Sequence, residues 1–183
     1  RLLLEHVCGC THADLIAHPE RELTAEQAAQ FEALLARREA GEPLAYLVGS
    51  AFFYGLEFAV TPAVLIPRPD TEVLVDQALA QAKDYAAPRI VDLGTGSGIV
   101  AILLARLCAS ASVTAVDVSA PALDVARVNA ARHEVQVRFL EGDWYAPLGD
   151  ERFDLIVSNP PYVVDGDPHL RQNGLPFEPQ SAL

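Results

Sequence analysis

The sequence predicts an α/β protein in which a small helical domain precedes a doubly wound, mostly parallel sheet. Its 183 residues, 51% of them hydrophobic, are enough for one or two domains with a sizeable core. From residue 89 onward, short apolar segments alternate with longer helical segments, which is the pattern of parallel strands joined by crossover helices. Three glycines between Gly94 and Gly98 directly follow the first of these strands, as in a tight strand-to-helix turn.

The N-terminal part of the chain, residues 1–43, is expected to form the helical domain. Thr24 and Gln27 have the spacing of a capping box, and they precede a long amphipathic segment at residues 25–40. Its apolar residues recur at helical spacing, and Gly41 ends the pattern.

Residues 44–66 are expected to form a β-hairpin that links the helical domain to the rest of the chain. Two segments rich in aromatic and apolar residues, 46–53 and 56–60, flank a turn at Tyr54 and Gly55.

The alternating pattern of residues 67–183 indicates the α/β domain. Asp70 is expected to cap a helix that ends near Lys83. The expected strands cover residues 89–93, 113–116, 135–140 and 153–157, and the expected helices cover residues 99–108 and 120–131. Right-handed crossovers bring the loops that follow parallel strands to one edge of the sheet, where ligands bind. The residues that follow strands should therefore line one crevice.

The composition argues against several classes of function. The formal net charge is −12, whereas non-specific nucleic-acid binding requires clustered Lys and Arg. No apolar segment approaches the ~20 residues that span a bilayer, and no segment resembles a secretory signal. Three cysteines without a paired framework are typical of reduced thiols. We therefore expect a cytoplasmic protein without a membrane partner.

The glycine loop is the candidate cofactor site. It consists of Gly94, Thr95, Gly96, Ser97 and Gly98. It is not a dinucleotide-binding fingerprint, because the third glycine comes one residue early and Ile99 stands where that pattern needs a small residue. It is not a P-loop either, because no Gly-Lys-Ser/Thr follows. A plain strand-to-helix turn is the remaining alternative.

Two further acidic residues and an aromatic residue extend this candidate site. Asp117 ends the second strand, where a carboxylate can accept both hydroxyls of a ribose. Its alternative role is to cap the next helix, although Ser119 suits that task. Asp143 and Trp144 follow the third strand and could bind an adenine amino group and its ring. The alternative for Trp144 is an ordinary place in the core.

The candidate reaction site is the segment after the fourth strand: Asn159, Pro160, Pro161 and Tyr162. The Asn159 side chain and the Pro160 backbone each supply a carbonyl that can hold one hydrogen of a planar nitrogen. Two prolines stiffen the loop, and Tyr162 offers an aromatic face to a flat amide or a cation. Beside a cofactor loop, this arrangement predicts methyl transfer to an amide or amino nitrogen from S-adenosyl-L-methionine. The alternative is a simple turn.

Over nearly its whole length the chain resembles the release factor glutamine methyltransferases, the HemK/PrmC family of class I S-adenosylmethionine-dependent enzymes. Besides the two loops above, the resemblance rests on Pro67, Arg68, Pro69, Asp70, Thr71 and Glu72, and on Phe177, Glu178, Pro179, Ala182 and Leu183. Members of that family carry further strands that complete the sheet. We therefore expect the protein to continue past Leu183, because the fourth strand would otherwise be an exposed apolar edge.

The resemblance implies methylation of the side-chain amide nitrogen of the glutamine in the Gly-Gly-Gln motif of peptide chain release factors. It implies that the helical domain recognises this protein substrate, and that no nucleic acid is bound directly. The residues of the glycine loop, Asp117 and Trp144 would contact the donor. Asn159 would lie between the donor and the glutamine, with Pro160 and Tyr162 framing the substrate. Arg68, Thr71 and Glu72 would border the pocket.

Two other functions are compatible with parts of this pattern. Adenine-N(6) methyltransferases of DNA or RNA share the Asn-Pro-Pro-Tyr segment, but such an enzyme predicts a basic groove, which this acidic chain lacks. A non-catalytic donor-binding protein would be favoured if Asn159 or the glycines were missing. His6, Cys8, Cys10 and His12 match no zinc-binding pattern, so no metal is expected.

Overall fold

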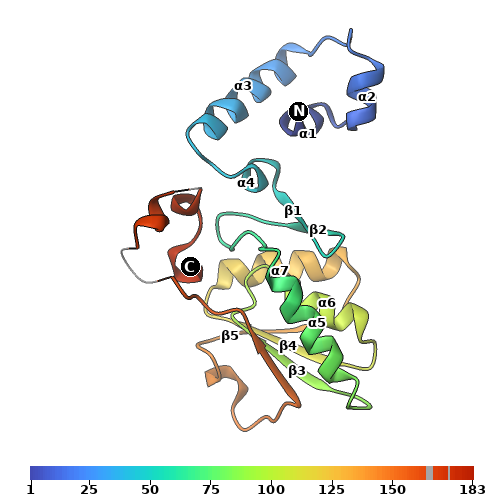
Figure 1. The fold of residues 1–183 in the computed structure, drawn as a ribbon, viewed down its shortest axis with the longest axis vertical. Helices are drawn as coiled ribbons and strands as arrows, with labels where there is room; N and C mark the ends of the chain where they lie inside the picture. Colours follow the sequence, from blue (N-terminus) through green and yellow to red (C-terminus); the bar gives the residue numbers. More distant parts are fainter. Residues whose placement is uncertain (164–166, 173) are drawn as a thin grey trace.

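The computed structural model describes residues 1–163, 167–172 and 174–183 of the chain. Four helices at the N-terminus, α1 to α4, lie at the top of Figure 1, and the α/β part lies at the bottom. Their bounds are Leu2–Cys8 for α1, His12–Ala17 for α2, Ala25–Glu39 for α3 and Leu44–Val48 for α4. The capping box of α3 is confirmed: the Thr24 hydroxyl accepts from the Gln27 N–H, and the Gln27 side chain accepts from the Thr24 N–H.

Helix α4 corrects the prediction of a strand at residues 46–48, which was wrong. The helix begins after Pro43 and ends at Gly49, whose φ of 76° is left-handed. Its apolar residues pack with those of α1 and α3, where Leu47 meets the buried Leu34. A short apolar segment suits a strand or a helix equally well, and packing against these helices decides the outcome.

The hairpin linker is shorter than expected but has the expected turn. Strands β1 (Ser50–Phe53) and β2 (Leu56–Ala59) pair in antiparallel fashion around Tyr54 and Gly55. Phe58 is completely buried, and its ring lies 4.6 Å from the ring of His133, which follows α7. The hairpin therefore packs on the α/β part of the chain. The division of the chain at residues 43 and 66 stays a prediction.

Four parallel strands form the sheet, in the order β5-β4-β3-β6. Their bounds are Arg89–Leu93 for β3, Ser112–Asp117 for β4, Arg138–Glu141 for β5 and Leu155–Ser158 for β6. The predicted parallel sheet is thus confirmed, although β5 begins three residues later than expected. The delay arises because the Val135 N–H still bonds to the Ala130 carbonyl at the end of the preceding helix.

The helices of this part are α5 (Thr71–Ala82), α6 (Ile99–Leu107) and α7 (Ala120–Arg132). Asp70 precedes α5 as expected, but its side chain makes no capping hydrogen bond. Its own backbone is already helical (φ −60°, ψ −24°), whereas a capping residue normally has an extended backbone. The Arg68 and Pro69 carbonyls instead accept from the first N–H groups of the helix.

Helices α5, α6 and α7 cover one face of the sheet, and the crossover after β5 covers part of the other, where Ile156 of β6 is 55% exposed. The chain runs from β3 to β4 to β5 in one direction, so right-handed crossovers place α6 and α7 on the same face. It then returns to the other side of β3, through a crossover with a short 3-10 helix at Ala146–Leu148. Leu148 packs against Val91 and Leu93 on the second face. The turning point of the chain therefore lies beside the carboxyl end of β3.

In the described part of the chain, no helix is both long and apolar enough to cross a membrane. The same residues contain no cluster of His, Cys, Asp or Glu side chains that could hold a metal ion.

Asn129 of α7 joins the hairpin to the glycine loop. Its side chain is completely buried. Its amide group donates to the Ser97 carbonyl (2.9 Å) and to the Ala59 carbonyl (3.0 Å), and its oxygen accepts from the Ala59 N–H (2.7 Å). One side chain thus fixes the distance between β2 and the loop.

Replacement of Asn129 by alanine should therefore destabilise the protein. Three backbone groups would lose their partner, which predicts a loss of about 2–3 kcal/mol in the free energy of unfolding. Urea unfolding measures it. Arg127→Ala on the same helix is the control, because Arg127 forms only an exposed pair with Asp124. Equal stability of the two variants would contradict this role of Asn129.

Candidate active site

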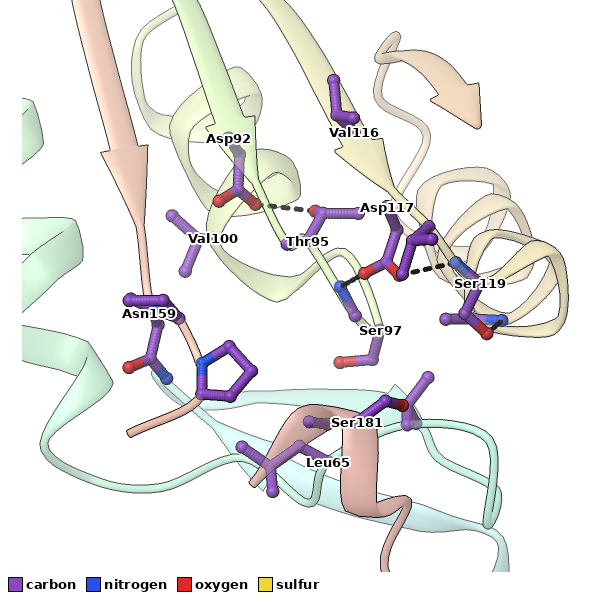
Figure 2. A pocket seen from close by; sticks show the side chains of 18 of the residues that line it. Leu65, Asp92, Thr95, Ser97, Val100, Val116, Asp117, Ser119, Asn159 and Ser181 are labelled. Carbon is purple, nitrogen blue, oxygen red and sulfur yellow. Dashed lines mark hydrogen bonds between the residues drawn. The ribbon is translucent and has the colours of Figure 1, made fainter. Parts of the chain in front are cut away.

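A cavity lies at the carboxyl ends of the strands, where the sequence predicted it. The segments that line it follow β3, β4, β5 and β6, or belong to the linker before α5 and to the C-terminal segment. They include residues 94–97, 117–119, 142–144, 159–161, 63–65, 67–68 and 181–182. Figure 2 shows Asp92, Asp117 and Asn159 around this cavity, above Leu65 and Ser181. The structure thus brings the two candidate loops to one place.

The glycine loop turns sharply and approaches α7 closely. Gly94, Gly96 and Gly98 all have positive φ, at 73°, 55° and 81°. A Cβ atom added at Gly98 would lie 2.9 Å from the Cβ atom of Ala126, so no larger residue fits there. Gly98 packs behind the loop and does not line the cavity, whereas the other four loop residues do.

Asp117 holds the loop from the neighbouring strand. Its carboxylate accepts from the Gly96 N–H (2.8 Å) and from the Ser119 N–H (2.9 Å), as the dashed lines in Figure 2 show. Ser119 caps α7 by accepting from the Ala122 N–H. The alternative role of Asp117 as the helix cap is therefore filled by Ser119. Because each carboxylate oxygen can accept more than one hydrogen bond, Asp117 can still receive hydroxyl groups from a ligand in the cavity.

Asp143 and Trp144 form the wall that follows β5. Trp144 has a left-handed backbone (φ 47°) and a relative exposure of 48%, so it is not a core residue. A non-glycine residue in this conformation costs about 1 kcal/mol or more, and such strain gathers at functional sites. The backbone thus presents a flat apolar ring to the cavity.

Asn159 follows β6 directly and lines the same cavity as the glycine loop. In the sheet register, Ser158 stands opposite Leu93, and its hydroxyl donates to the Leu93 carbonyl at 2.7 Å. The Asn159 amide group donates to the Thr71 hydroxyl at 3.3 Å. The side-chain nitrogen of Asn159 can only donate, so its carbonyl oxygen is the atom that can accept from a ligand.

The other predicted reaction-site residues fall into two groups. Pro160 and Pro161 line the cavity, as do Arg68 and Thr71. Tyr162 does not line it, and its relative exposure is 78%. Glu72 does not line the cavity either: its carboxylate accepts from the Tyr54 N–H at 3.0 Å and holds the hairpin turn.

Asp92 lines the cavity as well, although the sequence did not single it out. It is 2% exposed and accepts from the Thr95 hydroxyl at 2.6 Å. Burial raises the pKa of its carboxyl from 3.8 to about 6, and the nearby charge of Asp117 adds to the rise. The signal in the sequence was an acidic residue inside an otherwise apolar strand. A buried carboxylate of this kind would be stabilised by a cation in the cavity.

The raised pKa of Asp92 predicts that stability depends on pH. The unfolded chain loses this proton near pH 3.8 and the folded chain near pH 6, so the stability of the ligand-free protein falls as pH rises through this window. The destabilisation caused by the buried, charged carboxylate reaches its full value above pH 6. Asp92→Asn should therefore raise the free energy of unfolding at pH 8 by on the order of 3 kcal/mol, and at pH 5 by about half as much.

Thermal unfolding of both proteins at the two pH values measures this difference. Asp124→Asn, which changes an exposed carboxylate of α7, serves as the control. A gain for Asp92→Asn that is the same at pH 5 and pH 8 would show that Asp92 does not titrate in this range.

Comparison with known proteins gives matches along the whole chain. The family model of the methyltransferase small domain matches residues 69–172, and that of the PrmC N-terminal domain matches residues 1–49. The release factor glutamine methyltransferase of Bordetella pertussis is 53% identical over 184 residues, which cover 100% of this chain and 68% of the relative. That of Escherichia coli is 45% identical over 183 residues, covering 100% of this chain and 66% of the relative. The chain thus spans about two thirds of the length of these relatives.

A solved structure with the same α/β layout is a 16S rRNA methyltransferase of T. thermophilus in complex with AdoMet and guanosine. It is 27% identical, with a TM-score of 0.53, over 64% of this chain and 33% of that chain. The similarity to these relatives extends over the whole of this chain. The parallel sheet and the cavity at the carboxyl ends of its strands are consistent with a methyltransferase fold. This chain belongs to the release factor glutamine methyltransferase family.

Proposed function

We propose that the protein transfers a methyl group from S-adenosyl-L-methionine to the side-chain amide nitrogen of a glutamine in peptide chain release factors, within their Gly-Gly-Gln motif. The observation that carries this proposal is the shared cavity, which is lined by the glycine loop and Asp117 on one side and by Asn159 and Pro160 on the other. A donor bound on the first side would meet an acceptor bound on the second.

The residues on the donor side fit the chemical groups of S-adenosylmethionine. Gly94 and Gly96 have no heavy atom within 4 Å of an added Cβ position, so the loop backbone is open to a ligand. The Asp117 carboxylate suits ribose hydroxyls, and Trp144 offers an apolar face to an adenine ring. Asp92 adds a buried carboxyl that can balance positive charge. When bound, the donor supplies a methyl carbon activated by a sulfonium charge.

On the acceptor side, Asn159 and the prolines address the weak nucleophilicity of an amide. The amide lone pair is delocalised into its carbonyl, so catalysis depends on holding the nitrogen in line with the methyl carbon. The Asn159 carbonyl oxygen and the Pro160 backbone carbonyl can each accept one of its two N–H groups. The bond between Asn159 and Thr71 fixes the orientation in advance. Such positioning can contribute up to roughly 7–11 kcal/mol to lowering the barrier.

No strong base is needed before transfer in this proposal. The N–C bond would form as the bond between the methyl carbon and the sulfonium sulfur breaks, so that the sulfur leaves as a neutral thioether. The positive charge passes to the nitrogen, which becomes strongly acidic, and its proton can be lost late to water. The two carbonyl acceptors stabilise the N–H groups as that charge develops. Tyr162, which lies outside the cavity, is proposed to contact the protein substrate around the glutamine.

The helical domain at residues 1–43 is proposed to recognise the release factor. The match of residues 1–49 to the PrmC N-terminal domain supports this assignment. A release factor is a protein of the translation apparatus, which accords with a cytoplasmic location. The net charge of −12 favours a protein surface of basic character over nucleic acid.

Incubation with labelled donor tests the proposed activity. The full-length protein should label a release factor, but neither DNA nor a factor whose Gly-Gly-Gln motif carries Gln→Ala. The assay counts label on each substrate after separation. Label on DNA would favour the adenine-N(6) alternative, and label on the altered factor would refute the target residue.

Replacement of Asn159 by alanine should separate catalysis from donor binding. We expect turnover to fall by roughly 100-fold or more, because a preorganised acceptor is lost. Donor affinity, measured by calorimetry, should change little, because the loop and Asp117 remain. Arg127→Ala should keep full turnover. Undiminished turnover of Asn159→Ala would remove this side chain from the mechanism.

A further inference from the structure

The C-terminal segment, residues 174–183, begins beside the residues that follow α3 and ends at the cavity, which Ser181 and Ala182 line. It is the red end of the ribbon in Figure 1. At its start it packs against the end of the helical domain. A Cβ atom added at Gly174 would lie 2.9 Å from the Cγ atom of Pro43, and one added at Gly41 would lie 3.7 Å from the Phe177 ring. The segment is therefore in close contact with the residues that follow α3.

Glu178 anchors the middle of this segment to the linker before α5. Glu178 as a whole is 5% exposed. Its carboxylate accepts from the Ile66 N–H at 3.0 Å and forms an ion pair with the Arg68 guanidinium. Arg68 itself lines the cavity. A buried ion pair of this kind adds little net stability over an apolar pair, although it fixes geometry.

The far end of the segment holds the reaction loop. Pro160 and Pro161 have no N–H group, so Tyr162 and Val163 carry the first backbone donors after Asn159. Both donate to the Leu183 carbonyl, at 3.0 Å and 2.7 Å. Leu183 is itself buried. The described contacts therefore connect the loop that carries Asn159 to Leu183, five residues beyond Glu178.

We propose that Glu178 is a positioning residue, which holds the segment and through it the loop that begins at Asn159. Only the expected effect on kcat rests on the proposed function; the expected effect on hydrogen exchange does not. The buried carboxylate fixes the segment on the linker, the Leu183 carbonyl then fixes Tyr162 and Val163, and Asn159 is kept beside the donor side of the cavity. Docking of a protein substrate on the helical domain would press on the same segment at Gly174.

Hydrogen exchange of the ligand-free, full-length protein tests the positioning directly. In Glu178→Gln, which keeps the size of the side chain but loses its charge, the Tyr162 and Val163 amides should exchange at least ~10-fold faster. Amides of β3 should be unaffected. Glu151→Gln is the control, because Glu151 pairs with Arg89 and Arg138 where β3 and β5 begin, at the edge of the sheet away from the cavity. If Glu178→Gln does not fold, Glu178→Asp, which retains the charge on a shorter side chain, replaces it.

Kinetics distinguish positioning from general structural support. We expect kcat on the release factor to fall roughly 10- to 100-fold. The Kd of the donor should change less than about threefold, which is well under 1.4 kcal/mol. Unchanged exchange at Tyr162 and Val163, or faster exchange throughout the sheet, would overturn the proposal. If Glu178→Gln shows faster exchange at these two amides while the unaltered protein labels no release factor, the positioning role would be supported and the proposed function refuted.

Discussion

The parallel register of three strands determines where every candidate residue of this protein lies. Leu93 stands opposite Val116 on one side and opposite Ser158 on the other. The residues that come next in each strand therefore leave the sheet at the same level, and they are Gly94, Asp117 and Asn159. A shift of one residue in either pairing would turn each strand's side chains to the opposite face. The glycine loop, Asp117 and Asn159 line one cavity because the register of the sheet ends the three strands at the same level.

Long-range contacts between side chains and backbone connect the remaining parts of the chain to this edge. Glu72 accepts from the Tyr54 N–H, Asn129 bonds to Ala59 and Ser97, and Glu178 accepts from the Ile66 N–H. Each contact joins the hairpin or the linker to an element that carries the cavity. The N-terminal helices therefore reach the site through these polar contacts and through apolar packing, in which Tyr46 of α4 clusters with Val60, Val64 and Ala122.

The sequence was sufficient for the features that depend on local pattern. The glycine loop, Asp117 and Asn159 follow apolar strands directly, so the topology of a parallel sheet predicts their common edge. Features that depend on distant partners were beyond it. Glu178 meets Ile66 and Arg68 across 112 and 110 positions of the chain. The strand predicted at residues 46–48 is a helix because of packing with Leu34. Tyr162 lies outside the cavity lining and is exposed, and its N–H donates to the distant Leu183 carbonyl.

The close approach of Gly98 to Ala126 affects the thermodynamics of ligand binding. Ala126 and Asn129 lie three positions apart on α7, and both contact the glycine loop. Helix α7 therefore fixes the conformation of the glycine loop before any ligand binds. The loop then loses little conformational entropy on binding. Ala126 and Gly98 are also matched in volume, so enlargement of either residue would require a compensating change in the other.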